Sequence, residues 1–429
     1  VLFGNHDRAV LEIAATIIAP AAHLFRIGLS GSTHVKLVRA PDGRQLNPIV
    51  PAAWWDAVPD GPPEAFPAMM DSLRDAGPVT VRFERGTTQC LPAIAPPRMR
   101  MVGQSSSLTT LARSRGTGPL LDTTEDSGRG PLVHLEQLTL GGAGSSGPVV
   151  RVRRGGARCV GVTIVDAGGD AIETRGEAHL TLDGCAINGA GGAGVAVRDE
   201  GGRPGSTHIV RGLRIAGAKR GIEFVGGPEP ISPSALVLGD AKIAGGIVGV
   251  APAGSEVFLR DVEVSGDTEL TIPNGLVTAW ACALSGSRVA LHVQQARAVT
   301  VGNCRLTAGP APGGASAGGG VARGLQVSAQ QPRRLVPFLV AGRSAFVGKG
   351  ALSAVVGLGR PGKVAPRLVL RDPTFDGLHQ RAVLLLDGGN AYVFRAVRTG
   401  PTGGLELLGN TGRGDGGAAL SYFENGPVR

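Results

Sequence analysis

Short phrases in which apolar and polar residues alternate, each followed by glycine, recur along the middle of the chain. Residues 168–197, "GGDAIETRGEAHLTLDGCAINGAGGAGVAV", contain two such phrases, with Ile172 and Val195 at matching places. Alternation with a period of two predicts β-strands, and glycine accepts the backbone conformations of tight turns without steric cost. The segment is therefore predicted to be one unit of a repeating β structure.

Aligned on their apolar anchor residues, the phrases form two interleaved ladders. The steps of the first ladder are 22, 23, 27 and 26 positions, and its members are Val150, Ile172, Val195, Ile222 and Val248. The steps of the second are 23, 28, 28 and 21 positions, and its members are Ile164, Ile187, Ile215, Ile243 and Val264. Two strands in every 21 to 28 residues predict an all-β fold, a right-handed parallel β-helix. Phrases at 298–306, 367–375 and 382–397 extend the pattern.

A helical pattern precedes these coils. Residues 64–77, "EAFPAMMDSLRDAG", place apolar side chains at helical spacing, and "VTVRFERGT" at 79–87 then alternates as a strand. A helix here would cover the open end of the first coil. The predicted organisation is an attachment or anchoring segment over 1–50, a capping helix with lead-in strands over 51–105, a parallel β-helix with loop insertions over 106–400 and a C-terminal strand or cap over 401–429.

Composition narrows the functional classes. The chain is 42% hydrophobic and 18% charged, which predicts a folded core, and its net charge of +9 favours an acidic partner. Aromatic residues make up only 4%, which argues against an extended platform for stacking nucleic-acid bases or neutral sugars. The five cysteines form no CxxC pair and the histidines form no HExxH group, so we predict no metal site and no cofactor.

Two further features concern burial. The apolar run at 9–25 is interrupted by Glu12 and Pro20, so we predict a buried or amphipathic segment and no membrane insertion. Cys185 and Cys304 share an inward position with Val162 in the alignment, so we predict that both cysteines belong to the core.

With the anchors pointing inward, every second residue points outward, and equivalent residues of successive coils stack about 4.8 Å apart. This places Arg153, Arg175 and Arg198 in one outward column, and it places Arg214 and Lys242 on a second face. Rows of guanidinium groups offer paired donors to the carboxylates or sulfates of a glycan. The five basic residues are therefore candidate glycan-binding residues. A solvated face with local arginine–glutamate pairs is the alternative.

Catalytic candidates come from "VDAGGDAIE" at 165–173, which places Asp166, Asp170 and Glu173 on one turn and the strand that follows it. Glycoside hydrolysis uses two carboxyl groups about 5–9.5 Å apart. Aspartate and glycine are also common in turns for conformational reasons. The Gly-His-Gly that accompanies the paired aspartates of polygalacturonases is absent, so whether the protein is an enzyme stays open.

The motifs "AVPDG" at 57–61, "PPRMRMVGQ" at 96–104 and "LEQLTLGG" at 135–142, together with the helix and strand between them, resemble the N-terminal part of pectate-lyase-like β-helix proteins. That class includes bacteriophage tailspikes and capsule depolymerases. The resemblance covers residues 57–142 as motifs and extends to near residue 310 as a fold pattern. It implies a homotrimer on a virion or extracellular particle, made in the bacterial cytoplasm and attached to other particle proteins through the N-terminal segment.

The favoured hypothesis is a virion-type spike or adhesin that binds anionic cell-surface polysaccharide, and not nucleic acid, through the outer face of the β-helix. The first alternative is a polysaccharide lyase or glycoside hydrolase that uses Asp166, Asp170 and Glu173. The second alternative is a structural rod that binds no glycan.

Overall fold

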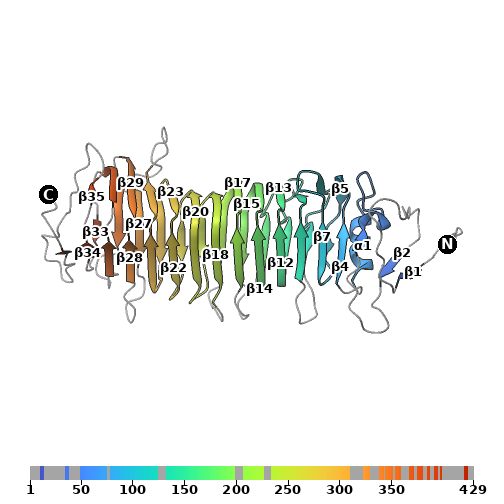
Figure 1. Cartoon of the computed structure of the whole chain (residues 1–429), viewed down its shortest axis with the longest axis horizontal. Helices are drawn as coiled ribbons and strands as arrows, with labels where there is room; N and C mark the ends of the chain where they lie inside the picture. Colours follow the sequence, from blue (N-terminus) through green and yellow to red (C-terminus); the bar gives the residue numbers. More distant parts are fainter. Residues whose placement is uncertain are drawn as a thin grey trace. The chain divides into compact units, whose positions relative to one another are not determined.

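The computed structural model describes residues 49–74, 78–123, 132–198, 206–226 and 233–309, together with separate strand segments within 10–37 and 322–423. Their regular secondary structure is almost entirely β-strand, and the strand pairings among them are parallel. The chain divides into two compact units. The first unit contains Val1–Arg198 and Arg211–Lys219, and the second contains Asp199–Val210 and Arg220–Arg429. Each unit is a parallel β-solenoid (Figure 1).

Each complete coil passes through three strands, and equivalent strands of successive coils pair to form three sheets, here called A, B and C. The early strands of sheet A are β3 (Ile49–Pro51), β4 (Val79–Arg82), β7 (Met99–Val102) and β10 (Leu132–Glu136). Those of sheet B are β5 (Gly86–Cys90), β8 (Thr109–Arg113), β11 (Thr139–Gly141) and β13 (Thr163–Ala167). Sheet C begins with β6 (Ala93–Ile94) and β9 (Leu121–Asp122).

Several longer strands bend from one sheet into the next. β12 (Val150–Val160) and β14 (Ile172–Asp183) run from sheet C into sheet A, with a register shift between Arg153 and Gly155. β15 (Ala186–Arg198) runs from sheet B into sheet C. β16 (Thr207–Arg211) and β17 (Arg214–Val225) contribute residues to both units.

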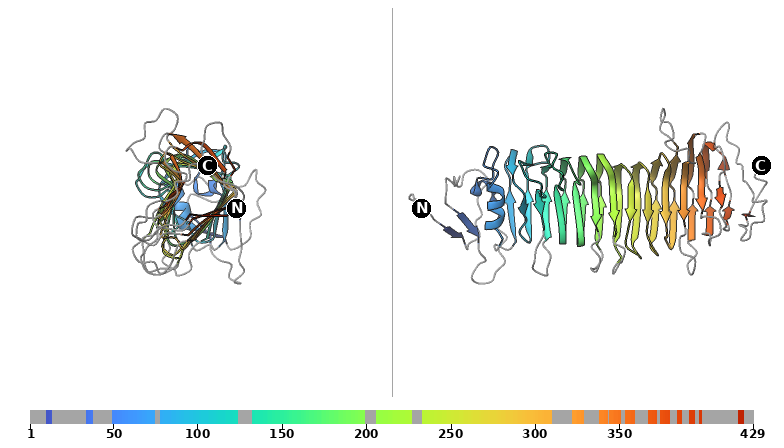
Figure 2. Two further views of the ribbon diagram at one scale, coloured as in Figure 1. Left: turned by 90° about the vertical axis from the view of Figure 1, so that its left-hand side faces the viewer. Right: turned by 180° about the vertical axis from the view of Figure 1, so that it is seen from behind.

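The second unit repeats the three-sheet pattern, seen from the opposite side in Figure 2. After the parts of β16 and β17 that belong to it, its strands are β18 (Ala235–Ala244), β19 (Ile247–Val250), β20 (Glu256–Ser265), β21 (Glu269–Thr271), β22 (Leu276–Trp280), β23 (Ala283–Gly286), β24 (Val289–Gln294), β25 (Ala298–Gly302) and β26 (Arg305–Ala308). The strand segments that follow are β27 (Ala322–Ser328), β28 (Phe338–Gly342), β29 (Ala345–Gly350), β30 (Ser353–Leu358), β31 (Arg367–Arg371), β32 (Thr374–His379), β33 (Leu384–Leu386), β34 (Ala391–Phe394), β35 (Val397–Arg398) and β36 (Leu420–Phe423).

Sheet A is the part of the fold that the sequence pattern missed, because two strands per repeat were expected and the structure has three. The corner from sheet A to sheet B is one residue in the left-handed conformation, such as Gly184, Asp240 or Asn303. A one-residue corner leaves two strands almost continuous in sequence. The phrase at 298–306 is therefore divided between β25 and β26.

The predicted capping helix is present as α1 (Ala65–Ser72), which follows the short 3-10 helix η1 (Ala52–Trp55). α1 contacts β5 and β6, the first strands of sheets B and C. Phe66 of α1 is fully buried, and its ring centroid lies 6.3 Å from that of Phe83. α1 therefore covers core that would otherwise face water at the start of the first unit.

The predicted N-terminal attachment segment and C-terminal cap lie largely outside the described residues. Strand β1 (Val10–Ile13) pairs with β2 (His34–Leu37) in a separate two-stranded sheet, and this pairing is what the structure describes of the first 48 residues. Within the described residues, no helix is long and apolar enough to cross a membrane.

Both anchor ladders point into the core, with one correction. Val150 pairs with Ile172 and Ile172 pairs with Val195, as the alignment predicts. Ile222, however, pairs with Ile247 and not with Val248. Gly245 and Gly246 both have positive φ and bring the chain into β19 one residue early, so Ile247 is buried and Val248 is only half-buried.

The cysteine prediction is confirmed, since Cys185 and Cys304 are buried and unoxidised, as are the other three cysteines. Burial raises the pKa of the Cys159 thiol well above its ordinary value. Thiols in this state behave as small hydrophobic side chains.

A half-buried carboxylate, that of Asp267, stabilises a corner of the second unit. Asp267 Oδ1 accepts hydrogen bonds from the backbone N–H groups of Arg288 (2.9 Å) and Val289 (3.1 Å), and Oδ2 accepts one from Arg288 Nε (3.0 Å). Burial opposes ionisation, but these bonds outweigh it and lower the pKa of Asp267. The stabilisation is therefore present above the unfolded-state pKa and is lost as pH falls through the lower folded-state pKa.

We expect Asp267→Asn to destabilise the protein by about 1.5–3 kcal/mol at pH 7, because two backbone donors lose a charged acceptor. The measurement is the urea midpoint followed by circular dichroism at pH 7 and at pH 3. The difference from wild type in the free energy of unfolding should become smaller at pH 3, because protonation of the Asp267 carboxylate removes part of its stabilising effect. Asp261→Asn is the control, because Asp261 is exposed and asparagine accepts its left-handed backbone. Equal effects of the two substitutions would contradict the assignment.

Candidate functional site

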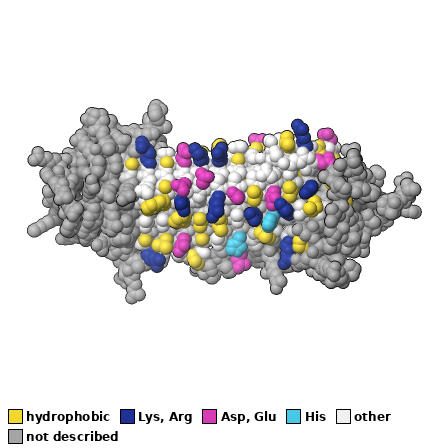
Figure 3. All heavy atoms as spheres, in the orientation of Figure 1, with side chains coloured by type: hydrophobic (Ala, Val, Ile, Leu, Met, Phe, Trp, Pro, Cys, Tyr) yellow, Lys and Arg dark blue, Asp and Glu magenta, His cyan; other side chains and the backbone are white. Residues whose placement is uncertain are grey.

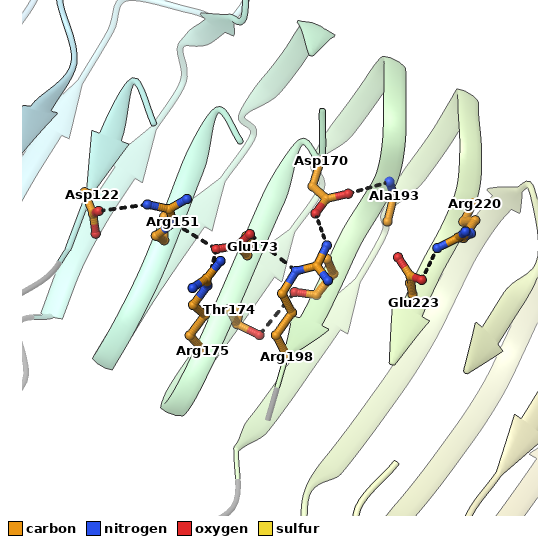
Figure 4. A network of polar contacts seen from close by, with 11 residues as sticks. Asp122, Arg151, Asp170, Glu173, Thr174, Arg175, Ala193, Arg198, Arg220 and Glu223 are labelled. Carbon is orange, nitrogen blue, oxygen red and sulfur yellow. Dashed lines mark hydrogen bonds and ion pairs between the residues drawn. The ribbon is translucent and has the colours of Figure 1, made fainter. Parts of the chain in front are cut away.

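The predicted arginine column lies on the outer face of sheet C in the first unit. Arg153 pairs in register with Arg175, and Arg175 pairs with Arg198, so the three residues occupy equivalent places on three successive coils. The strand spacing places such neighbours about 4.8 Å apart. Figure 4 shows Arg175 and Arg198 of this column directed toward Glu173.

Glu173 on β14 holds guanidinium groups from three strands. Its Oε1 accepts hydrogen bonds from Arg151 Nε (2.8 Å) and Arg175 Nε (2.5 Å), and its Oε2 lies 3.3 Å from Arg198 Nε. The Glu173 side chain points outward, as the alternation predicts, yet only 6% of it is exposed because the arginines cover it. One carboxylate therefore orients the outer face of three coils.

Two aspartates complete this network. Asp122 Oδ2 lies 3.5 Å from Arg151 Nη1. Asp170 Oδ2 accepts a hydrogen bond from Arg198 Nη2 (2.6 Å), while Asp170 Oδ1 accepts one from the backbone N–H of Ala193 (2.8 Å). We call the six residues the Glu173 cluster, namely Asp122, Arg151, Asp170, Glu173, Arg175 and Arg198.

The Glu173 cluster is electrically balanced, since its three carboxylates match its three guanidinium groups. Burial opposes the ionisation of Glu173, but hydrogen bonds from Arg175 and Arg151 and the charges of both outweigh it, so its pKa is lowered. Glu173 is therefore ionised at neutral pH. A general acid needs a raised pKa, so its surroundings are the opposite of those that this role requires.

Arg153 adds a positive charge that the Glu173 cluster does not balance. Its backbone N–H donates to Thr123 Oγ1 (3.1 Å), but its Nε is buried and has no hydrogen-bond partner in the described structure. A donor in this state is costly unless an acceptor reaches it. The column therefore combines one cation, Arg153, that pairs with no carboxylate in the described part of the chain with two guanidinium groups, those of Arg175 and Arg198, that are each about one-third exposed.

The structure brings together two of the three predicted catalytic carboxylates. Asp170 and Glu173 both contact Arg198. Asp166 is exposed and has a positive φ of 52°, at the corner place that Gly189 occupies on the next coil. Among the described residues, no hydrogen bond or ion pair joins Asp166 to the other two. Its local role is that of a turn residue, and the catalytic role of the three stays a prediction.

The remaining candidates lie elsewhere on the surface. Arg214 is exposed on β17, and Lys242 lies on the part of β18 in sheet B, where its Nζ is 2.9 Å from Oε2 of Glu263. Neither residue joins the Glu173 cluster. Asp122 belongs to the cluster but was not predicted, because its strand is only two residues long and precedes the recognised ladder. The apolar residue before it, Leu121, pairs with the anchor Val150 and is the signal that points to it.

Comparisons with known proteins agree on the fold. The A-module of the Azotobacter vinelandii mannuronan C-5 epimerase AlgE6 is 12% identical, with a TM-score of 0.54 over 82% of this chain and 100% of that chain. The AlgE4 A-module is 11% identical, with a TM-score of 0.52 and the same coverage. Tailspike protein 3 of bacteriophage CBA120 is 9% identical, covering 82% of this chain and 62% of that one, but its TM-score of 0.41 supports no further argument.

No protein-family model matches the sequence, and neither does any curated protein. At identities near 12% the structural likeness establishes architecture alone. By its fold the chain is a parallel β-helix protein, as the motif resemblance implies.

Proposed function

We propose that the protein binds an anionic polysaccharide on the outer face of sheet C in the first unit, through Arg153, Arg175 and Arg198. The observation that carries the proposal concerns Arg153, which pairs with no carboxylate among the described residues and whose buried Nε has no hydrogen-bond partner there. It lies in register with two partly exposed guanidinium groups. A carboxylate or sulfate would supply both the negative charge and the hydrogen-bond acceptor that Arg153 lacks among the described residues.

The Glu173 cluster supports this role by holding Arg175 and Arg198 in place before a ligand arrives. Orienting long side chains in advance reduces the conformational entropy that binding would otherwise cost. An acidic glycan carries charges at regular intervals, so a chain lying along the coil axis would meet an arginine on each coil. Each contact on such a surface is weak, and several copies of the protein would strengthen attachment through avidity.

Within this proposal the chain is a spike or adhesin component of a virion or extracellular particle, acting as a homotrimer. The support for this finer role is the motif resemblance over residues 57–142 and the basic net charge of +9. The N-terminal segment would then attach the chain to other particle proteins.

The test is binding of the purified protein to immobilised polyuronate, sulfated glucan and neutral glucan of matched length. We expect Arg153→Ser to weaken binding to at least one anionic polymer by about tenfold, which is 1.4 kcal/mol. Arg153 lies outside the Glu173 cluster, so its removal leaves that network intact. Arg85→Ser is the matched control, because it removes the same charge from an exposed position in the same unit. Equal affinities for the two variants would contradict the proposal.

The same polymers, followed by gel filtration, test the two alternatives. A fall in polymer size that is abolished by Asp170→Asn would identify a depolymerase. Absence of both binding and shortening with every polymer would favour a structural rod.

A further inference from the structure

The outer face of sheet A in the second unit differs in chemistry from the arginine column. In the sheet A parts of β18, β20, β22 and β25, which are residues 235–239, 256–260, 276–280 and 298–302, the charged residues at outward positions are Glu256 and Arg260. Three exposed apolar side chains lie on the same face, namely Val237, Phe258 and Trp280, and of these Phe258 lies between the two charged residues on β20. In Figure 3, hydrophobic side chains form a group in the left half of the described surface, over the strands labelled β18 to β22 in Figure 1. Apolar groups that gather on a surface commonly mark a binding site.

Trp280 lies against the backbone of the next coil. It pairs in register with Gly302, and a Cβ built on Gly302 would lie 2.3 Å from the indole atoms Cε3 and Cζ3. The indole therefore occupies the space that any larger residue at position 302 would need. Gly302 is buried beneath the ring, while Trp280 itself is 47% exposed. The ring therefore contacts the sheet at Gly302, while about half of the residue is open to solvent.

Hydrogen-bonding groups surround this ring. Thr278 lies two residues before Trp280 on the same strand, and Thr300 pairs with Thr278 on the next coil. Both threonines are half-buried, and Arg260, in register with Trp280 on the preceding coil, is exposed. On the coil before that, the corresponding residue is Gly239, where a Cβ would meet no atom within 4 Å. Gly239, Arg260 and Trp280 thus follow one another on successive coils. This part of sheet A presents a flat apolar ring with hydroxyl and guanidinium groups beside it and open space over Gly239.

We propose that Trp280 is the platform of a sugar-binding subsite that takes the apolar face of an uncharged hexopyranose ring. A pyranose combines an apolar face of C–H groups with hydroxyls at its edge, which matches an exposed indole face flanked by Thr278, Thr300 and Arg260. Tyrosine and tryptophan are enriched at contacts in which one end is apolar and the other is hydrated. The outward charges of this surface, Glu256 and Arg260, cancel. The surface therefore does not favour the acidic ligand that is proposed for sheet C.

A second copy of the chain is a weaker match to this geometry. Tryptophans that dominate protein interfaces are enclosed in well-packed pockets on the partner, whereas this indole lies flat against its own sheet. The subsite is in another unit and on another sheet from the arginine column. It therefore does not rest on the proposed function of sheet C, and either proposal can fail without the other.

Tryptophan fluorescence provides a direct test. The chain has three tryptophans. Trp54 and Trp55 are buried, so Trp280 is the tryptophan whose fluorescence a sugar in solution can change and which acrylamide can quench. The probes are maltohexaose, cellohexaose and laminarihexaose. We expect at least one of them to shift the emission to shorter wavelength in a saturable manner and to protect it from acrylamide quenching.

Variants separate stacking from other causes. By calorimetry, Trp280→Ala should weaken binding of the active sugar by about tenfold, the value of one stacking contact. Trp280→Phe should retain part of the affinity, and Arg153→Ser should leave it unchanged. The proposal is overturned if none of the three sugars gives a saturable change, or if Trp280→Ala binds as well as wild type. It is also overturned if the shift follows protein concentration and sedimentation shows self-association, since the occupant is then a second copy.

Discussion

Glu173→Gln is expected to destabilise the first unit by about 3–5 kcal/mol, because guanidinium groups from three coils lose their shared buried counter-charge. The change preserves the size of the side chain, so it tests charge and not packing. Glu173 is only 6% exposed, and Arg151, Arg175 and Arg198 all lie within 3.3 Å of its oxygens. The measurement is the urea midpoint, followed by circular dichroism at pH 7.

Glu136→Gln is the matched control for this result. Glu136 accepts two hydrogen bonds from Arg100, at 2.9 and 2.6 Å, but that pair lies on the surface of sheet A. Exposed pairs are worth about 0–1 kcal/mol, so its midpoint should move little. If Glu173→Gln moved the midpoint no further than Glu136→Gln, the Glu173 cluster would have no special part in stability.

The effect of Glu173 should depend on pH in a defined direction. Its pKa is lowered in the folded state, so its contribution is present above the unfolded-state value of about 4.3. That contribution disappears as pH falls through the lower folded-state pKa. The difference between wild type and Glu173→Gln should therefore be constant from pH 7 to pH 5 and should become smaller in more acidic solution.

Gly191→Ala is the second substitution for which we expect a large loss, at or above the upper end of the about 1–3 kcal/mol typical of overpacking. A Cβ at this position would lie 2.1 Å from the carbonyl oxygen of Gly168 on the preceding coil. A Cβ at Gly168 would in turn lie 2.0 Å from the carbonyl oxygen of Gly144. The corner between sheets B and C thus stacks backbone directly on backbone, and no flexible side chain can move away.

Gly239→Ala is the control for Gly191→Ala. Its Cβ would meet no atom within 4 Å, and its φ lies outside the left-handed range. We expect an unchanged or slightly raised urea midpoint, since alanine reduces the entropy of the unfolded chain. A Gly191→Ala protein with the midpoint of Gly239→Ala would show that the corner can relax, contrary to the close contacts in the structure.

The repeat was predictable because its signal is local. Ile172 and Val195 follow similar turns and begin similar strands, and they pair in register in sheet C. The same local signal failed at Val248, where two glycines change the entry to the strand, so that Ile247 pairs with Ile222 instead. It also failed for sheet A. The corner from sheet A to sheet B has a single left-handed residue, so no recognisable turn sequence separates the two strands.

By itself the sequence determined the coil architecture, the inward anchors and the side of each strand on which a charge lies, because a period of two orients every side chain along a strand. Only the tertiary structure decided which outward groups meet. Glu173 contacts Arg151 and Arg198 of the neighbouring coils, and Trp280 covers Gly302 of the next. Coils differ in length, so these pairings depend on the register between strands, which is set by packing over the whole coil.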